Sequence, residues 1–273
     1  MTLSAPAIRL RKRRNGADPL VMVTAYDEPG ARLVAAAGVD LILVGDSVAN
    51  VMLGQETTLH LTVDQMSHHV RAVAAAHADV HVVADMPWLS YHIDVAESVR
   101  NAAVLIRSGA NSVKLEGGRV RRDVVRALLD AQIPVMGHLG LTPQSVLAFG
   151  GFKVQAKTLE SAKLLIEDAQ LLQEEGVFAI VIEGVPSVVG KNVTEALDIP
   201  TIGIGAGPDT DGQVLVFHDL LGLTNRAPAK FVRQYADLGT VITKAIGQFA
   251  ADVRSGDFPN VDEAYPNPDG LFD

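Results

Sequence analysis

The order of apolar and polar positions along the chain predicts eight short buried strands that alternate with amphipathic helices. The apolar runs are rich in Val and Ile and lie at residues 20–26, 41–46, 80–86, 112–116, 134–139, 179–184, 201–205 and 213–218. Alanine-rich stretches with helical spacing separate them, at residues 28–37, 63–77, 94–108, 120–131, 158–175 and 187–197. Repeated alternation of strand and helix is typical of a parallel sheet.

Eight units favour a closed barrel over an open doubly wound sheet. An open sheet more often has about six strands and a GxGxxG turn after the first, and no such turn follows residues 20–26. We therefore predict an α/β fold, a (β/α)8 TIM barrel that forms a single domain over residues 1–273. The lead-in is assigned to residues 1–18 and an irregular tail to residues 256–273. Residues 213–222 could equally be helical, and a helix at 229–253 is expected to close the barrel.

The composition is that of a globular, enzyme-sized domain. The chain has 273 residues, of which 48% are hydrophobic, and this length is usual for one α/β barrel. A net charge of −9 argues against nucleic acid as a partner and favours a small ligand. Cysteine is absent, so any metal must be held by oxygen or nitrogen ligands.

The chain has no recognisable membrane or export segment. No apolar run approaches the roughly 20 residues needed to cross a bilayer, so we expect no membrane partner and a cytoplasmic location. The basic run at residues 10–14 lacks the hydrophobic stretch that follows in a signal peptide. We interpret it as an exposed lead-in.

Three carboxylates lie where predicted strands end. Asp46, Asp85 and Glu116 close the second, third and fourth strands, which are neighbours in a barrel, so the three side chains should converge at its C-terminal mouth. Oxygen ligands of this kind suit Mg²⁺, and a cation would relieve their mutual repulsion. Each acid alone could instead cap a helix or form an ion pair.

Two further charged groups belong to the same end of the predicted barrel. Lys114 and Glu116 are two positions apart and share a strand face. Lys114 could neutralise a carboxylate substrate, form a Schiff base, or simply pair with Glu116. Glu183 ends the sixth strand in an apolar setting that should raise its pKa towards that of a general base. Its alternative role is a hydrogen bond to a neighbouring strand end.

The remaining candidates are weaker. His138 ends the fifth strand and could donate to a ligand or accept a proton, although a core histidine is nearly as common. The segment Gly203-Ile-Gly-Ala-Gly207 ends the seventh strand and could bind phosphate or permit close packing. The long connections at residues 47–62 and 140–157 are expected to line or cover a site.

In order along residues 20 to 258, eight motifs resemble those of the ketopantoate hydroxymethyltransferase family. They are Thr24-Ala-Tyr-Asp27, Val44-Gly-Asp-Ser47, Ala84-Asp-Met-Pro87, Val113-Lys-Leu-Glu-Gly-Gly118, Gly137-His-Leu-Gly-Leu-Thr-Pro-Gln144, Gly150-Gly-Phe-Lys-Val-Gln155, Gly203-Ile-Gly-Ala-Gly207 and Asp211-Gly-Gln213. Each motif alone is weak, but so many at the expected spacing make a specific match.

The resemblance implies transfer of a one-carbon unit from 5,10-methylenetetrahydrofolate to the keto acid 3-methyl-2-oxobutanoate, giving 2-dehydropantoate. It implies Glu183 as the catalytic base, and Mg²⁺ held by Asp46 and Asp85 with Glu116 as a further carboxylate. The substrate-binding residues that it implies are Asp46, Ser47, Asp85, Lys114 and His138. It also suggests a cytoplasmic homodecamer.

Three alternatives remain open from the sequence. The acidic strand ends also resemble those of the isocitrate lyase and phosphoenolpyruvate mutase group, in which carbon–carbon cleavage would replace one-carbon transfer. An aldolase could form a Schiff base on Lys114. A noncatalytic barrel that binds a keto acid or folate would show binding without turnover.

Overall fold

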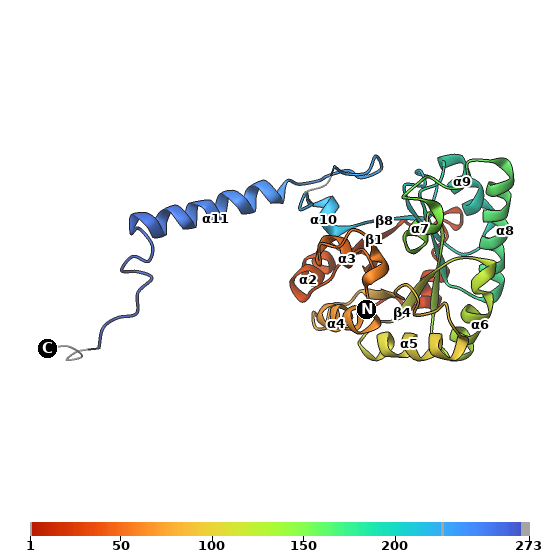
Figure 1. The fold of residues 1–273 in the computed structure, drawn as a ribbon, viewed down its shortest axis with the longest axis horizontal. Coiled ribbons are helices and arrows are strands. Elements are labelled where there is room, and N and C mark those ends of the chain that lie inside the picture. The colour runs from red at the N-terminus through yellow and green to blue at the C-terminus, as the bar shows by residue number, and fades with distance from the viewer. Residues whose placement is uncertain (1, 225–226, 269–273) are drawn as a thin grey trace. The chain divides into compact units, whose positions relative to one another are not determined.

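The computed structural model describes residues 2–224 and 227–268, and its central feature is a closed barrel of parallel strands in chain order (Figure 1). The strands are β1 (Leu20–Thr24), β2 (Leu41–Val44), β3 (His81–Asp85), β4 (Ser112–Glu116), β5 (Val135–Gly140), β6 (Ala179–Glu183), β7 (Thr201–Ile204) and β8 (Gly212–Leu215). Strand β8 pairs with β1 in parallel, with Gly212 opposite Leu20, and this closes the sheet. The predicted (β/α)8 barrel is confirmed.

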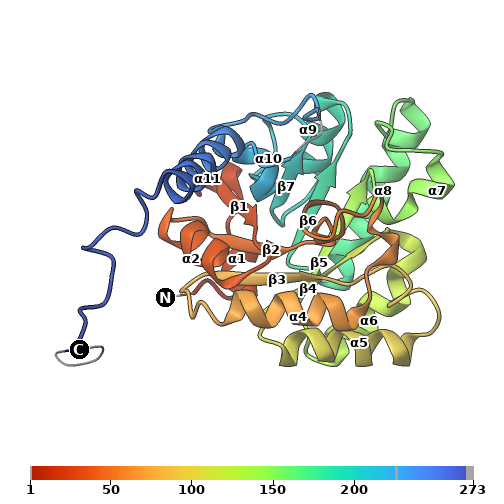
Figure 2. The same cartoon turned by 60° about the vertical axis from the view of Figure 1, so that its left-hand side comes forward.

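The predicted helices surround the barrel, and neighbours along the chain pack together (Figure 2). They are α2 (Glu28–Ala36), α4 (Val63–Ala74), α5 (Val95–Arg107), α6 (Arg122–Asp130), α8 (Leu159–Glu175) and α9 (Ser187–Ala196). Polar side chains begin several of them: the Asp27 carboxylate accepts from the Gly30 N–H, and Thr62 forms a capping box with Gln65. The local sequence therefore sets these helix starts.

The two long connections contain short elements of their own. The first holds α3 (Val48–Val51) and a 3-10 turn at Thr58–His60. The second holds a 3-10 turn at Pro143–Ser145 that leads directly into α7 (Val146–Phe149). Both connections follow strands at the C-terminal end of the barrel, where active sites of this fold lie.

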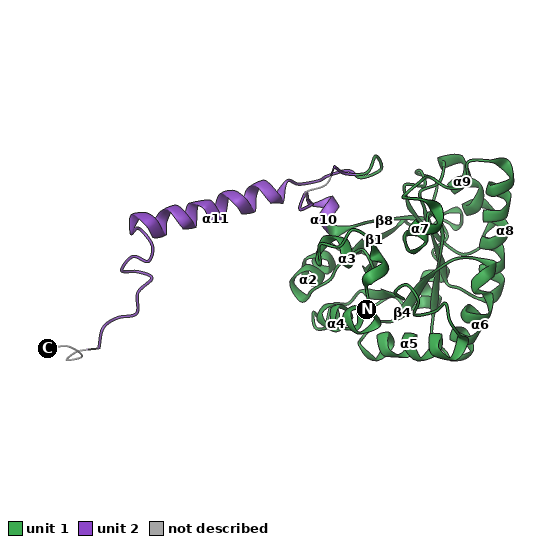
Figure 3. Ribbon diagram, in the orientation of Figure 1, with its two compact units in different colours: residues 1–217, 229–232 green, residues 218–228, 233–273 purple. Residues whose placement is uncertain are grey.

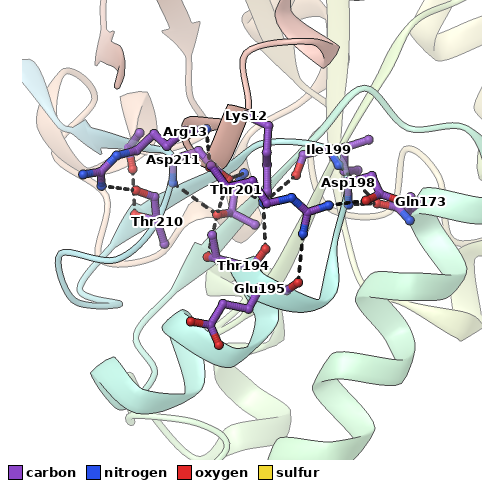
Figure 4. Close-up of polar contacts among 12 residues, drawn as sticks. Lys12, Arg13, Gln173, Thr194, Glu195, Asp198, Ile199, Thr201, Thr210 and Asp211 are labelled. Carbon is purple, nitrogen blue, oxygen red and sulfur yellow. Dashed lines mark hydrogen bonds and ion pairs between the residues drawn. The ribbon is translucent and has the colours of Figure 1, made fainter. Parts of the chain in front are cut away.

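The N-terminal segment is anchored rather than simply exposed (Figure 4). Helix α1 (Ala5–Arg9) places Ile8 in the apolar cluster that fills the barrel. Lys12 is 1% exposed, and its Nζ lies 2.8 Å from Asp211 Oδ2. The same ammonium donates to the carbonyl oxygens of Thr194 and Ile199, at 2.7 and 3.1 Å. The expectation of an exposed basic lead-in is therefore wrong for Lys12, because a partner far along the chain buries it.

Asp211 joins this lysine to the strands that close the barrel. Its Oδ2 accepts the Thr201 N–H at 2.9 Å, and its Oδ1 accepts the Arg13 N–H at 2.9 Å. Thr201 begins β7 and Asp211 immediately precedes β8, so one carboxylate holds the N-terminal segment and both strand starts. Both oxygens of this buried carboxylate accept hydrogen bonds, as a buried charge requires.

The chain divides into two compact units (Figure 3). The first comprises residues 1–217 and 229–232 and contains the barrel. The second comprises residues 218–228 and 233–273 and contains α11 (Leu238–Ser255). Another short helix, α10 (Phe217–Leu220), follows β8, so the region that could have been strand or helix contains both.

Helix α11 is shorter than predicted and buries none of its residues. Its N-cap, Asp237, accepts from the Thr240 N–H, so it begins well after residue 229. Closure of the barrel comes from the pairing of β8 with β1 and not from this helix. The described part of the tail, residues 256–268, contains turns, and residues 269–273 lie outside the described residues. Within the described chain, no helix has the length and apolarity to span a membrane.

The Lys12–Asp211 pair should dominate the stability of the barrel's closing strands. We expect Lys12→Met to lower the free energy of unfolding by about 3–5 kcal/mol, because it leaves the Asp211 charge buried without its cation. Urea denaturation followed by far-UV circular dichroism would measure this. Arg14→Met is the control: it removes the exposed Arg14–Asp198 pair and should cost less than about 1 kcal/mol. Equal losses of unfolding free energy in the two variants would contradict a dominant role for the Lys12–Asp211 pair.

Candidate active site

The inside of the barrel changes from apolar to polar towards the carboxyl ends of the strands. Val83, Met136 and Val181 belong to the apolar cluster within the barrel. Two positions further along the same strands, and hence on the same face, lie Asp85, His138 and Glu183. The period of a β-strand therefore delivers these polar groups to one mouth.

Asp46 and Asp85 lie in direct contact at this mouth. The Asp46 backbone N–H donates to Asp85 Oδ2 at 2.9 Å, and both side chains are buried. Gly45 makes room for them: a Cβ there would lie 2.9 Å from Ser47 Oγ and 3.5 Å from Asp85 Oδ2. Ser47 Oγ in turn lies 2.8 Å from the Tyr26 hydroxyl. The turn after β2 thus brings both aspartates and the predicted substrate-binding serine together.

Lys114 supplies the positive charge of the cluster. Its Nζ lies 2.7 Å from Asp85 Oδ1 and 3.2 Å from His138 Nδ1. Burial works to lower the pKa of Lys114, but the charges of Asp85, Asp46 and Glu116 outweigh it and raise the pKa to about 12. Burial raises the pKa of Asp85 to about 6 even though Lys114 opposes the shift. Lys114 is accordingly an ammonium ion at neutral pH.

Glu116 faces the connection after β5. Its Oε2 accepts the Gln144 backbone N–H at 3.0 Å, and its Oε1 lies 3.6 Å from His138 Nδ1. Burial, followed by the charge of Asp46, raises the pKa of Glu116 well above its ordinary range. Lys114 and Glu116 share a strand face, as predicted, but the closest carboxylate to the lysine is Asp85. The strand therefore does not form a simple ion pair between Lys114 and Glu116.

His138 connects the lysine to Glu183. Burial, helped by the charge of Lys114, lowers the pKa of His138 well below its usual value, so the ring is neutral. Because the Lys114 ammonium can only donate, His138 Nδ1 is the acceptor and the ring proton belongs on Nε2. That nitrogen lies 3.2 Å from Glu183 Oε2 but is not aligned for a hydrogen bond. A small rotation of either side chain would complete the contact.

Glu183 has the electrostatics of a general base. Burial raises its pKa to about 7, and Lys114 opposes the shift only in part. Its side chain keeps 16% of its surface exposed, so water at the mouth limits the desolvation. A carboxylate that titrates near neutral pH can both accept and return a proton.

The donor set fits Mg²⁺ in part. Hard carboxylate oxygens are the ligands that this ion prefers, and it commonly uses one or two of them together with water and substrate oxygens. Asp46 and Asp85, in contact and buried, meet that description. Among the residues that the structure describes, however, no group of three or more His, Asp or Glu side chains is arranged as a complete metal site. Glu116 instead engages Gln144 and His138.

Two residues that the strand-end pattern did not select hold the site together. Gln144 Nε2 donates to Asp46 Oδ2 at 2.9 Å and to the Met86 carbonyl at 3.0 Å. The Tyr91 hydroxyl donates to Gln144 Oε1 at 2.6 Å and accepts the Glu116 N–H at 3.2 Å. Both lie in connections between strands and helices, where hydrophobic periodicity does not identify functional residues. Only the family motif Gly137–Gln144 indicated Gln144 from the sequence.

The glycine-rich end of β7 is explained by close packing. A Cβ at position 207 would lie 2.5 Å from the Cβ of Ser187, and one at position 205 would lie 2.7 Å from Cδ1 of Phe231. Of the two interpretations of Gly203–Gly207, a phosphate cradle and a packing turn, these contacts favour the second.

Comparison with known proteins gives one family. A family model described as ketopantoate hydroxymethyltransferase matches residues 5–261. A 3-methyl-2-oxobutanoate hydroxymethyltransferase of Koribacter versatilis is 53% identical over 95% of this chain and 88% of that protein. One of Ignicoccus hospitalis is 52% identical over 92% of this chain and 94% of that protein.

Solved structures with the same fold are more distant in sequence. A phosphonopyruvate hydrolase in complex with oxalate and Mg²⁺ superposes with a TM-score of 0.62 at 15% identity, covering 98% of this chain and 92% of that one. A 2,3-dimethylmalate lyase, described as a member of the PEP mutase/isocitrate lyase superfamily, gives 0.60 at 16% identity, covering 97% and 93%. These likenesses concern the fold alone.

The raised pKa of Glu183 predicts a stability cost at high pH. The folded state keeps a proton that the unfolded chain releases between pH 4.5 and about 7, so the wild type loses stability across that window. Glu183→Gln avoids this loss and should be more stable than the wild type at pH 8 by about 1–3 kcal/mol, with the difference vanishing towards pH 4.5.

Urea unfolding of both proteins at several pH values would test this. The exposed Glu195→Gln serves as the control and should follow the wild type. A Glu183→Gln protein that is less stable than the wild type at pH 8 would show that the site stabilises the Glu183 carboxylate instead.

Proposed function

The chain belongs to the ketopantoate hydroxymethyltransferase family, and from this premise we propose that it transfers a hydroxymethyl group from 5,10-methylenetetrahydrofolate to 3-methyl-2-oxobutanoate, giving 2-dehydropantoate. The family places the enzyme in pantothenate synthesis. The observation that carries the detailed proposal is the combination of a buried ammonium, Lys114, with a carboxyl, Glu183, whose pKa is about 7.

The keto acid enters as an anion and needs a positive group in an otherwise acidic mouth. Lys114 is that group, since its pKa keeps it charged throughout the physiological range. Ser47, in contact with Tyr26, offers a hydroxyl donor beside Asp85. The His138 ring lies between the lysine and Glu183, with Nδ1 towards the lysine and the Nε2 proton on the Glu183 side. These residues, with Asp46 and Asp85 at the metal, would bind and orient the substrate.

Asp46 and Asp85 would hold Mg²⁺, with Glu116 as a further carboxylate near it. When bound, the ion would stabilise the negative charge that develops on the keto oxygen as C3 loses its proton. Gln144 holds Asp46 and Lys114 holds Asp85, so both carboxylates are fixed before any ligand enters. This pre-organisation means that little reordering would accompany binding.

Glu183 would remove the C3 proton. A base with a pKa of about 7 is half ionised at neutral pH and is stronger than an ordinary carboxylate. The Nε2 proton of His138 would hold the carboxylate in position. C3 of the enolate would then form a bond to the methylene carbon of the folate. Water supplies the hydroxyl oxygen, both C–N bonds of the methylene group break, and tetrahydrofolate leaves with a proton on each nitrogen; the sequence depends on position and needs no protein nucleophile.

The alternatives have less support. A Schiff base requires a neutral amine, whereas three neighbouring carboxylates keep Lys114 protonated. The 2,3-dimethylmalate lyase shares the fold at 16% identity, while the relatives at about half identity carry the hydroxymethyltransferase name. A noncatalytic binding barrel would have no use for a carboxyl whose pKa is raised to about 7.

The first half of the reaction can be tested without folate. In D2O with Mg²⁺, the wild type should exchange the C3 hydrogen of 3-methyl-2-oxobutanoate for deuterium, as followed by NMR. Glu183→Gln should slow the exchange by about 10²- to 10⁴-fold, because a positioned base is lost, and EDTA should slow it in the wild type. Exchange by the wild type should rise with pH and level off above about 7, as Glu183 ionises.

Glu195→Gln is again the matched control and should exchange at the wild-type rate. If the folded wild type shows no exchange, methylenetetrahydrofolate is added to the same tube. Absence of both exchange and 2-dehydropantoate would then rule out the proposed reaction.

We further propose that the chain self-associates as a cytoplasmic homodecamer. Helix α11 carries the apolar side chains Val241, Ile246 and Phe249, which its own compact unit leaves more than half exposed. A helix of this kind supports self-association, because exposed apolar patches mark interfaces. Light scattering after size-exclusion chromatography should give ten times the chain mass. Ile246→Glu with Phe249→Glu should reduce that mass, whereas Lys244→Glu, a charge change on the same helix, should not. A monomeric wild type would contradict the proposal.

A further inference from the structure

Arg121 lies beside the acidic site, and no carboxylate of the described residues pairs with it. Its Nε is buried, and among the described residues nothing accepts a hydrogen bond from it. The guanidinium carbon lies 5.5 Å from the centre of the Tyr91 ring, a cation–π contact. Two nearby arginines differ: Arg119 pairs with Asp168, and Arg122 pairs with Glu175. Of these three, only Arg121 has no carboxylate partner among the described residues.

His92 provides a second unsatisfied group at the same place. Its ring packs on Tyr91 with centroids 4.2 Å apart and planes tilted by 42°. Its Nδ1 is buried and has no hydrogen-bond partner among the described residues. Burial and the charge of Arg121 lower the pKa of His92 to about 4, so the ring is neutral at pH 7. A neutral imidazole can donate one hydrogen bond without adding charge.

Tyr91 separates these two residues from the catalytic acids. Its hydroxyl is bound to Gln144 and to the Glu116 N–H, so its polar edge belongs to the acidic site. Arg121 contacts the face of the same ring. A ligand held by Arg121 would therefore lie one aromatic ring away from Glu116, close to the mouth and shielded from its negative charge.

We propose that Arg121, with His92 beside it, forms a carboxylate-binding subsite that receives the glutamate tail of the folate donor. This rests on the proposed function. Guanidinium and carboxylate groups pair through two parallel hydrogen bonds. The carboxylate of the keto acid already has Lys114, whereas the folate carries its carboxylates at the end remote from the reacting carbon. The available arginine therefore suits the second substrate.

Arg121→Met tests the subsite by its effect on each substrate. It keeps much of the side-chain volume and removes the donors. We expect KM for methylenetetrahydrofolate to rise about 10- to 100-fold, the effect of losing a charged hydrogen bond, while kcat and KM for the keto acid stay within twofold. With 5,10-methylenetetrahydropteroate, which carries the one-carbon unit but lacks the glutamate, wild type and variant should behave alike. Deuterium exchange into the keto acid should also be unchanged.

Arg122→Met is the matched control, because Glu175 keeps Arg126 as a partner and no ligand contact is proposed there. Both KM values should match the wild type, and Arg121→Lys should recover part of the loss. An unchanged folate KM in Arg121→Met, or an increase in the keto-acid KM instead, would overturn the subsite.

Direct binding separates this inference from the proposed reaction. Fluorescence titration with 5-formyltetrahydrofolate needs no turnover, and Arg121→Met should weaken its binding about 10- to 100-fold. Equal affinities would overturn the subsite even where the wild type is active. A wild type that binds the folate through Arg121 but forms no product would instead count against the reaction alone.

Discussion

The candidate active site depends on one buried ammonium ion. Lys114 lies among Asp85, Asp46 and Glu116, and its charge is what allows acids to collect at the mouth of an apolar barrel. Burial alone would favour their neutral forms, and it already raises the pKa of Asp85 to about 6. The lysine limits that shift; in the proposed function it would also keep carboxylate oxygens available for a cation and offer a positive group to the anionic keto acid.

A second lysine–aspartate pair shows how strongly the surroundings affect the pKa of a buried lysine. Lys12 and Asp211 are also buried and 2.8 Å apart, yet burial lowers the pKa of Lys12, whereas the pKa of Lys114 is raised. The surrounding charges differ: Asp211 and Asp198 raise the pKa of Lys12 while Arg14 lowers it, whereas three acids raise the pKa of Lys114. The first pair fastens the starts of the closing strands β7 and β8, and the second lies towards the carboxyl ends of β3 and β4, at the candidate site.

The mouth is held by hydrogen bonds from loops. Gln144 binds Asp46 through its amide and Glu116 through its backbone, and Tyr91 fixes the Gln144 side chain. Both residues are buried, so these bonds are shielded from water and restrict the acids to one arrangement. The same Tyr91 ring supports Arg121 on its face. One aromatic side chain thus orders the acids of the candidate site and supports Arg121 on its other side.

The chain pattern by itself determined the strands, the surrounding helices and the strand ends that carry Asp46, Asp85, Glu116 and Glu183. These follow from local periodicity, since a strand of period two that is apolar inside the barrel must present its terminal acid at the mouth. Tertiary structure alone decided the partners. Lys12 meets Asp211 across 199 positions, and Gln144 meets Asp46 across 98. No local pattern encodes such contacts, because they exist only once the barrel has closed and brought distant loops together.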